Sequence, residues 1–353
     1  MNAKVNRRRN DLYLQVGAVM FVVYSVWRLH PSNPQELPDP LLPSKQSKSP
    51  RLETWTVLDP ALPICRGNLV PVKNVPTVPS KSRIPRIIHQ TSKSRCITKN
   101  LSNSVSTWKA LDDYAYCFHD DDDIRNFFNS RDWSMFFPFK HMLPCIKYGA
   151  VLSDIWRYLF LWEFGGIYAD LDSATNQFNS TTISPDDDAF FIIERDGLLS
   201  QYFMAVSPRH PLMYYAIQRT ILALLREFDT GNVNAGYVSG PRALHEAFMH
   251  FLWDQGTRME HEEVKPHPVD TPGLYMGTDN RTILLVGTQQ TSNDLVHRES
   301  ILSRREKKKQ YSDMNMTHFS QRKPTKQACL SLVYRATMKE KQVKERRKHG
   351  KIF

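Results

Sequence analysis

The sequence predicts an α/β fold, because a helical pattern runs directly into a strand pattern between residues 145 and 173. Four apolar residues recur at the spacing of one helix face: Val151, Ile155, Tyr158 and Trp162. Gly165-Gly166 is expected to end this amphipathic helix. Residues 167–172 then alternate apolar and polar side chains, as a strand does.

Two carboxylates follow on one face of this expected strand, at Asp170 and Asp172, together with Tyr168. Paired carboxylates of this kind suit a hard divalent cation whose other ligands are phosphate oxygens and water. Asp154 and Arg157, three residues apart, share one face of the preceding helix. Each pair alone is common, so the combination of the four residues is the functional signal.

Three other segments complete the expected organisation of the globular part. Residues 84–91 are expected to form its first strand, which ends in polar residues. The four aspartates at 120–123 are interpreted as the cap of a helix rather than a metal cluster, because acidic side chains favour helix N-termini. The aspartates at 186–188 are interpreted as a solvated loop.

Composition excludes several classes of protein. The chain is 41% apolar and 24% charged, which argues against wholesale disorder, collagen-like and coiled-coil architectures. The net charge of +11 is concentrated at the two ends of the chain, whereas residues 81–297 carry 20 basic and 26 acidic side chains. We therefore expect no nucleic-acid partner.

The N-terminal region predicts a membrane anchor. A basic tail at 1–11 precedes an apolar segment at 12–29, and the three arginines at 7–9 place the N-terminus in the cytoplasm of a single-pass type II protein. A cleaved signal peptide is the alternative. Residues 31–80 hold 11 of the 22 prolines and are expected to form an extended stem, followed by a catalytic domain at 81–334 and a basic tail at 335–353.

Cysteines and glycosylation sequons are compatible with a lumenal domain. The five cysteines show no C-x-x-C spacing, which argues against a zinc site, and one or two disulfides with one thiol left over are expected. Four sequons begin at Asn100, Asn179, Asn280 and Asn315.

The motif Ser153-Asp154-x-x-Arg157 followed by Gly165-Gly166-x-Tyr168-x-Asp170-x-Asp172 resembles the Och1-like glycosyltransferases with a DXD sugar-binding region. This family includes initiation-type α-1,6-mannosyltransferases and inositol-phosphoceramide mannosyltransferases, and is related to α-1,4-galactosyl- and N-acetylglucosaminyltransferases. Ile84 to Thr91 resembles the family's opening strand, and Ser239-Gly240-Pro241 resembles a downstream segment.

The resemblance implies a GT-A fold, a Rossmann-like domain that binds a nucleotide-sugar and a divalent metal, Mn²⁺ or Mg²⁺. Asp172 would ligate the metal, and Asp170 would contact the donor and the metal shell, so both are the candidate catalytic residues. The donor would further be held by residues from both motifs: His89, Gln90, Thr91, Asp154, Arg157 and Tyr168. His318 is a candidate late metal ligand, with an ordinary surface histidine as the alternative.

These expectations define a metal-dependent, retaining hexosyltransferase of the Golgi membrane, with its catalytic domain in the lumen. GDP-mannose is the favoured donor and a UDP-hexose the second, and the acceptor is a glycan or glycolipid. An inactive lumenal glycan-binding relative is the main rival; the four intact site residues argue against it. A phosphotransferase with an Asp-x-Asp motif is a further rival, which the Gly-Gly-x-Tyr context disfavours.

Overall fold

The computed structural model describes residues 63–76, 80–136, 138–146, 149–194, 196–226, 235–253, 271–287, 295–298, 304–315 and Val333. They belong to one compact unit that spans residues 50–333. The anchor predicted at 12–29, the tails predicted at 1–11 and 335–353, and His318 lie outside the described residues. None of the helices within the described ranges has the length and apolar character needed to cross a bilayer.

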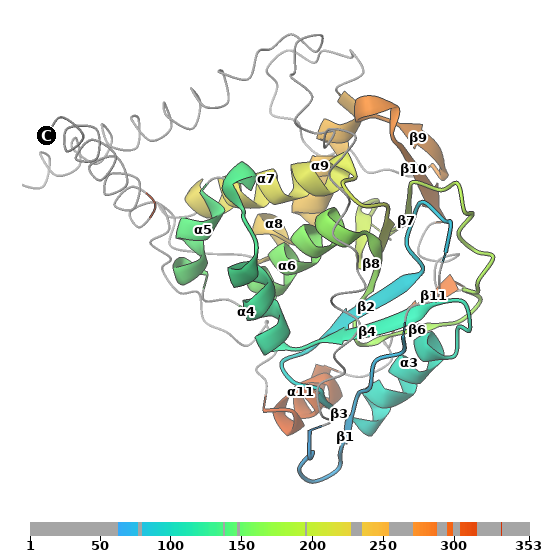
Figure 1. The fold of residues 1–353 in the computed structure, drawn as a ribbon, viewed down its shortest axis with the longest axis vertical. Helices are drawn as coiled ribbons and strands as arrows, with labels where there is room; N and C mark the ends of the chain where they lie inside the picture. The colour runs from blue at the N-terminus through green and yellow to red at the C-terminus, as the bar shows by residue number, and fades with distance from the viewer. Residues whose placement is uncertain are drawn as a thin grey trace, which may run out of the picture. The chain divides into compact units, whose positions relative to one another are not determined.

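A mixed seven-stranded sheet forms the centre of the domain (Figure 1), in the order β4-β2-β5-β8-β7-β10-β9. Its strands are β2 (Ile87–Thr91), β4 (Ala115–His119), β5 (Gly166–Ala169), β7 (Ala189–Ile193), β8 (Leu199–Val206), β9 (Gly273–Met276) and β10 (Thr282–Val286). β2 runs parallel to both β4 and β5, whereas β8 is antiparallel to β5 and to β7. β10 is parallel to β7 and antiparallel to β9. The predicted α/β class is confirmed.

Helices cover both faces of this sheet, with α6, α7 and α9 on one side and α3 on the other (Figure 1). The α-helices are α3 (Lys99–Lys109), α4 (Asp121–Ser130), α5 (Phe139–Met142), α6 (Gly149–Phe164), α7 (Pro211–Arg226), α8 (Ala235–Val238), α9 (Pro241–Trp253) and α11 (Arg304–Asp313). Short 3₁₀ turns in the described part of the chain are η1 (Ser134–Phe136), η2 (Leu143–Cys145) and η3 (Thr278–Asn280). In addition, β1 (Leu69–Pro71) pairs with β3 (Cys96–Thr98) in one two-stranded sheet, and β6 (Ser173–Thr175) pairs with β11 (Val296–Arg298) in another.

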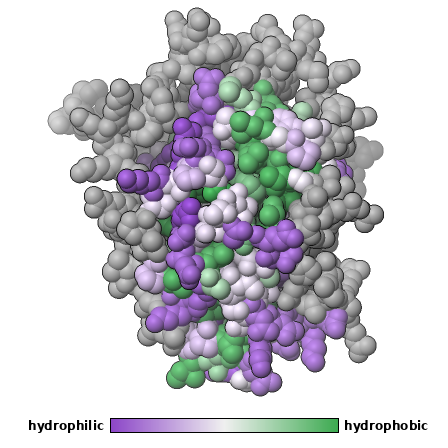
Figure 2. Space-filling view, turned by 90° about the vertical axis from the view of Figure 1, so that its right-hand side faces the viewer, coloured by the Kyte–Doolittle hydropathy of each residue, from purple (hydrophilic) through white to green (hydrophobic). Residues whose placement is uncertain are grey.

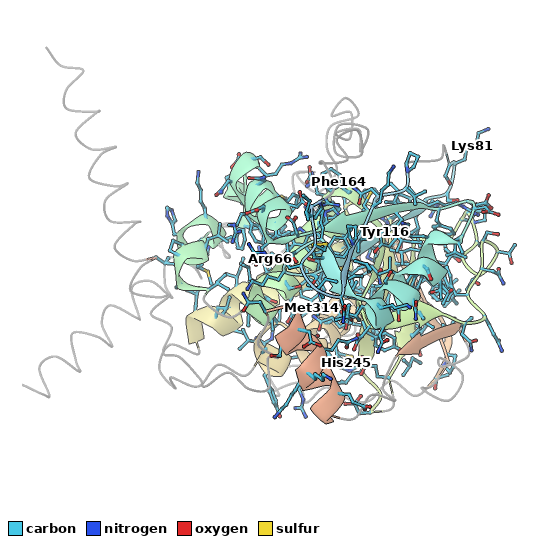
Figure 3. All side chains as sticks on the ribbon, turned by 90° about the horizontal axis from the view of Figure 1, so that it is seen from below. Arg66, Lys81, Tyr116, Phe164, His245 and Met314 are labelled. Carbon is cyan, nitrogen blue, oxygen red and sulfur yellow. A yellow bond between two sulfur atoms is a disulfide. The ribbon has the colours of Figure 1, made fainter. Side chains whose placement is uncertain are left out.

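The central strands are buried on both faces, because each face packs against other elements. Toward α3, Ile88, Tyr116 and Ile167 share one core cluster with Trp108. Figure 3 shows the labelled Tyr116 within the domain and Lys81 at its periphery. At the β9 edge the strand exposes Leu274 and Met276, by 67% and 53%, and hydrophobic residues gather in the upper part of the face shown in Figure 2.

The predicted break between helix and strand is confirmed at Gly165 and Gly166, whose φ angles are +65° and +100°. Both lie in the region that side chains other than glycine rarely adopt. The preceding helix differs from the amphipathic expectation, because most of its residues are buried, polar ones included. Its length is packed between the sheet and α7, so it has little polar outer face.

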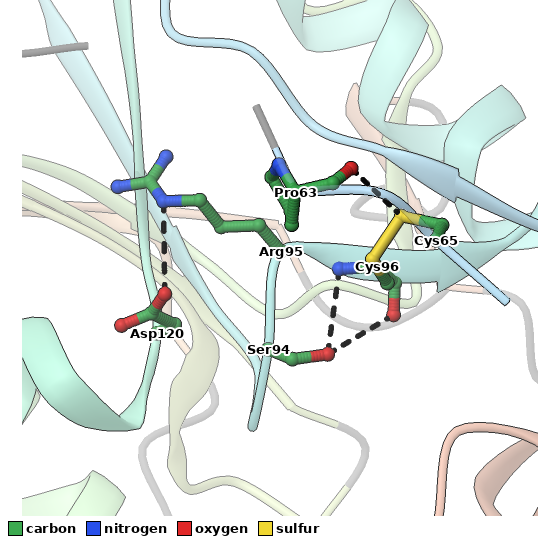
Figure 4. Close-up of a disulfide and its surroundings, with 6 residues drawn as sticks. All are labelled: Pro63, Cys65, Ser94, Arg95, Cys96 and Asp120. Carbon is green, nitrogen blue, oxygen red and sulfur yellow. Dashed lines mark hydrogen bonds and ion pairs between the residues drawn. A yellow bond between two sulfur atoms is a disulfide. The ribbon is translucent and has the colours of Figure 1, made fainter. Parts of the chain in front are cut away.

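The folded domain reaches into the segment predicted as an extended stem. β1 pairs with β3, Val75 bridges to Tyr116, and a disulfide joins Cys65 to Cys96 (Figure 4). Cys117 is free and buried. Local sequence could not show this, since the partners lie far along the chain: Cys96 is 31 residues from Cys65, and Tyr116 is farther still from Val75.

The two aspartate runs have different roles. Asp120 caps α4 and forms a capping box with Asp123, as predicted. In the second run Asp188 is buried, so the expectation of a solvated loop is wrong for that residue. Its carboxylate pairs with Arg281 and accepts a hydrogen bond from Ser207. The partner that overturns the expectation lies 93 residues away in sequence.

Alanine at Gly165 should be far more damaging than alanine at Gly67, although their φ angles are nearly equal (+65° and +62°). A Cβ at Gly165 would lie 2.7 Å from Pro208 and 2.8 Å from the Val206 carbonyl, whereas a Cβ at Gly67 meets nothing within 4 Å. Gly67→Ala carries only backbone strain of about 1–2 kcal/mol. We expect Gly165→Ala to lower the free energy of unfolding by at least about 2 kcal/mol more. Denaturant unfolding followed by tryptophan fluorescence measures both, and equal losses would contradict this packing.

Candidate functional site

The predicted site residues meet at one edge of the central sheet. β2 and β5 run parallel, so Thr91 and Asp170 lie at or just beyond their carboxyl ends. Because β8 is antiparallel to β5, its first residues lie at the same edge, and the backbone N–H of Asp170 donates to the Tyr202 carbonyl over 2.8 Å. Ligands of α/β sheets characteristically bind outside the carboxyl ends of parallel strands.

Arg157 lies between two carboxylates at this edge. Its Nη2 is 3.2 Å from Asp154 Oδ1, and its Nη1 is 3.4 Å from Asp170 Oδ1. The same Nη1 donates to the Gln201 carbonyl, and the guanidinium lies over the Tyr168 ring at 4.3 Å from the centroid. The sequence predicted the pair on α6, and the structure adds its connection to the strand end.

Tyr168 also contributes a hydrogen bond to the site, because its hydroxyl donates to Asp170 Oδ1 over 2.9 Å. Asp170 is therefore oriented by two neighbours through one carboxylate oxygen. Its side chain keeps 22% of its surface exposed, and Asp172 is half-buried. The strand predicted over 167–172 ends at Ala169, and residues 170–172 form a turn that the Ser173 N–H closes by donating to the Asp170 carbonyl. The more accessible carboxylates thus lie in the turn just beyond β5, and Asp154 is buried on α6.

Ser239 belongs to the site, although the sequence indicated no role for it. Its hydroxyl donates to Asp154 Oδ2 over 2.7 Å. Its carbonyl accepts from the Tyr158 hydroxyl and from Gln201 Nε2, each over 2.8 Å. The resemblance of residues 239–241 to a family segment was the available signal, but Ser239 and Asp154 are 85 positions apart, so local reasoning could not find the contact.

Burial raises the pKa of Asp154 to about 6, although Arg157 and Ser239 both favour its ionised form. Burial disfavours the charge of Arg157 as well. Interactions with the ionisable side chains around it, Tyr168 first and the carboxylates of Asp154 and Asp170 next, outweigh this and raise the pKa of its guanidinium. Arg157 is therefore a permanent, oriented cation at the sheet edge.

The predicted residues of β2 lie behind the site. His89 is 1% exposed, packs on Phe160, and pairs with His119 through ring nitrogens 3.2 Å apart. Burial lowers the pKa of His89 to about 3, so its ring is neutral. The expectation that His89 helps to hold the donor stays a prediction, and its side chain lies in the interior behind the strand end.

Gln90 and Thr91 support the strand end instead of facing outward. Gln90 is fully buried, and its Nε2 donates to the Asp170 carbonyl over 3.0 Å. The Tyr116 hydroxyl holds the other end of this amide, by donating to Gln90 Oε1. Thr91 is half-buried and donates to the His119 carbonyl. Gln90 thus fixes the backbone from which the Asp170 carboxylate projects.

A divalent metal fits these carboxylates only if another molecule supplies the rest of its ligands. In the parts of the chain described, no three His, Cys, Asp or Glu side chains gather to form a complete protein site. Asp170 and Asp172 supply hard oxygen donors of the kind that Mn²⁺ and Mg²⁺ accept, and such ions are commonly completed by substrate phosphates and water. The donor set therefore suits an ion that arrives with a diphosphate ligand.

Residues 89–187 match the family model described as "Glycosyltransferase sugar-binding region containing DXD motif". The matched residues include Asp154, Arg157, Asp170 and Asp172. This segment is similar to glycosyltransferase sugar-binding regions that contain a DXD motif. The family resemblance stated from the sequence is thereby confirmed.

Curated proteins similar to this chain come from Schizosaccharomyces pombe. Inositol phosphoceramide mannosyltransferase 1 is 32% identical over 142 residues, which cover 38% of this chain and 42% of the relative. Inositol phosphoceramide mannosyltransferase 3 is 26% identical over 196 residues, 54% of this chain and 51% of the relative. The chain thus spans about half the length of the curated relatives it matches. A solved structure, the PaToxG Glycosyltransferase, is 17% identical with a TM-score of 0.37 over 49% of this chain and 69% of its own, too low to establish a shared fold.

The raised pKa of Asp154 predicts how stability depends on pH. Between its unfolded value near 3.8 and its folded value of about 6, the folded state retains a proton that the unfolded state has lost. Stability from this group is therefore complete below pH 4 and decreases as pH rises through 6, by about 3 kcal/mol. Asp154→Asn removes the titration. Between pH 4 and 7.5, the free energy of unfolding of the variant should therefore rise by that amount relative to that of the wild type. Denaturant unfolding across this range measures it, with the exposed Asp186→Asn as control; an offset that does not change with pH would contradict the assignment.

Proposed function

We propose that the chain is a metal-dependent glycosyltransferase that moves a hexose from a nucleotide-sugar to an acceptor. The observation that carries this proposal is the fixed position of Arg157 between Asp154 and Asp170, at the strand end that also presents Asp172. A cation held by one buried carboxylate and one more exposed carboxylate suits a ligand that is anionic and bears hydroxyl groups. A nucleotide diphosphate attached to a sugar has both properties.

Each residue has a role in the proposed transfer. Asp172 and Asp170 would hold the divalent ion with the donor's diphosphate, and the ion would supply neutralisation of the leaving group's charge. Arg157 adds a preorganised positive charge whose orientation costs nothing at the moment of reaction, because Asp154, Gln201 and Tyr168 already fix it. Asp154 and Arg157 would also bind sugar hydroxyls and phosphate.

Transfer with retention of anomeric configuration is part of the proposal. The resemblance to retaining enzymes supports it, with the acceptor attacking on the face from which the diphosphate departs. Within that scheme Arg157 and the metal hold the diphosphate in place while the bond breaks. The leaving group's oxygen can then receive the acceptor's proton, and no protein nucleophile is assigned.

We propose mannose as the sugar, GDP-mannose as the donor and a glycolipid as the acceptor. The names of the S. pombe relatives, inositol phosphoceramide mannosyltransferases, support a mannosyl donor and a lipid-linked acceptor. The proposed location is the Golgi membrane, as a type II protein with its domain in the lumen. The Cys65–Cys96 disulfide supports an oxidising compartment.

Asp172→Asn tests the proposal. The full chain, purified in detergent, is incubated with GDP- and UDP-sugars in Mn²⁺ or in EDTA, and released nucleoside diphosphate and transferred sugar are measured. We expect metal-dependent release from GDP-mannose, reduced at least about 100-fold in Asp172→Asn, because the amide is a poor ligand for a hard cation. Asp186→Asn, an exposed aspartate in a separate loop, should retain wild-type activity.

Other results would correct the proposal in defined ways. Release from a UDP-sugar instead of GDP-mannose would replace the donor but keep the reaction class. Release of nucleoside monophosphate with sugar phosphate would identify a phosphotransferase. If the folded wild type neither releases nor binds any nucleotide, the transferase proposal fails and a glycan-binding role takes its place.

A further inference from the structure

The four sequons differ in how the structure presents them, and one has the properties of a glycan attachment site. We propose that Asn179 carries an N-linked glycan. It lies in the sequon Asn179-Ser180-Thr181, on the segment between β6 and β7. The proposal is independent of the transferase activity and concerns how this domain is modified.

The compartment that such a modification requires is indicated by cysteine chemistry. Cys65 and Cys96 are joined in a disulfide that ties the N-terminal part of the domain to β3, and Cys145 is disulfide-bonded as well. Such bonds persist in secretory compartments and are rare in the cytosol. N-linked glycosylation occurs along the same route, so a chain that forms these bonds also meets the glycosylating enzyme.

The sequon is held outward by its neighbour. Phe178 is 3% exposed and packs against Trp108 and Phe203, with ring centroids 5.6 Å apart in each pair. Its backbone N–H donates to the Leu295 carbonyl over 3.0 Å. Asn179, the next residue, is exposed. With Phe178 fixed in the core, a glycan on Asn179 would extend into solvent without displacing packed side chains.

The local turn brings the two sequon side chains together. Asn179 Oδ1 accepts from the Thr181 backbone N–H over 2.9 Å and from the Thr181 hydroxyl over 2.7 Å. Asn179 Nδ2 donates one hydrogen to the Gln177 carbonyl over 3.2 Å. Because a primary amide has two N–H bonds, the other hydrogen can be replaced by a sugar while this contact stays.

The covalent step balances with an oligosaccharide carried on a lipid diphosphate as co-substrate. A bond forms between Asn179 Nδ2 and the anomeric carbon of the oligosaccharide, and the bond from that carbon to the diphosphate oxygen breaks. The diphosphate leaves with the bonding electrons, and the amide proton passes to a base of the glycosylating enzyme. No change of oxidation state is involved.

Residues of the other sequons take part in contacts or secondary structure elsewhere in the domain. Arg281 and Thr282, which follow Asn280, donate to the buried Asp188 carboxylate. Asn100 is exposed, but its sequon lies within the first turn of α3 and is held in helical backbone. The Asn315 carbonyl accepts from Lys93, and the rest of its sequon lies outside the described residues. Asn179 is the sequon whose own side chains form an exposed turn.

The test uses the full chain expressed in a eukaryotic secretory host. Enzymatic deglycosylation in ¹⁸O-labelled water followed by peptide mass spectrometry should show a labelled aspartate at position 179. Asn179→Gln and Thr181→Ala should each remove one glycan. Thr182→Ala is the matched control, because Thr182 also bonds to Asn179, through its hydroxyl and the Asn179 N–H, but lies outside the sequon.

The outcomes separate the proposal from folding and from catalysis. An unmodified Asn179 in the folded wild type would overturn the proposal, and so would equal loss of the glycan in Thr181→Ala and Thr182→Ala. Unfolding curves of the variants should match the wild type, since the altered residues are exposed or half-buried. Nucleotide release should also be unchanged in Asn179→Gln, so a missing glycan and a missing activity are recorded independently.

Discussion

The buried ion network of Arg157 is the interaction on which the site depends. A guanidinium and a carboxylate on α6 can be removed from water at this depth only because each is paired and hydrogen-bonded. Their partners come from the end of β5, from the start of β8 and from Ser239 before α9. The network therefore joins helix, sheet and a distant segment, and its geometry is correct only when all of them are packed.

The glycine pair after α6 makes this network possible. Gly165 and Gly166 reverse the chain within two residues, so the strand returns beside the helix that precedes it. Arg157 and Asp170, 13 residues apart, then meet across the turn. Behind them the neutral, buried His89 and the amide of Gln90 fill the space under the strand end. The same sequence motif thus provides both the bend in the chain and the charges that the bend brings together.

Local sequence predicted what local chemistry determines. The helix, its glycine stop, the first part of the strand and the cap at Asp120 all follow from spacing and propensity, and so does the grouping of Asp154, Arg157 and Asp170. Long-range partners were beyond such reasoning: the Ser239 hydroxyl for Asp154, Arg281 for Asp188, and the pairing of β1 with β3. The sequence did not predict the interior position of His89, because the residue that covers its ring, Phe160 on α6, lies far along the chain.

The central claim is that Arg157, held between two carboxylates, binds the diphosphate of a nucleotide-sugar. Calorimetric titration of GDP and UDP into the full chain with Mn²⁺, comparing wild type with Arg157→Lys, tests it most directly. Lysine keeps the charge but loses the two-pronged geometry, so we expect at least about tenfold weaker binding of the preferred nucleotide. Arg131→Lys, at a pair with Glu163 on another part of α6, should bind like the wild type. Equal affinity in all three proteins, or no metal-dependent binding by the wild type, would contradict the account.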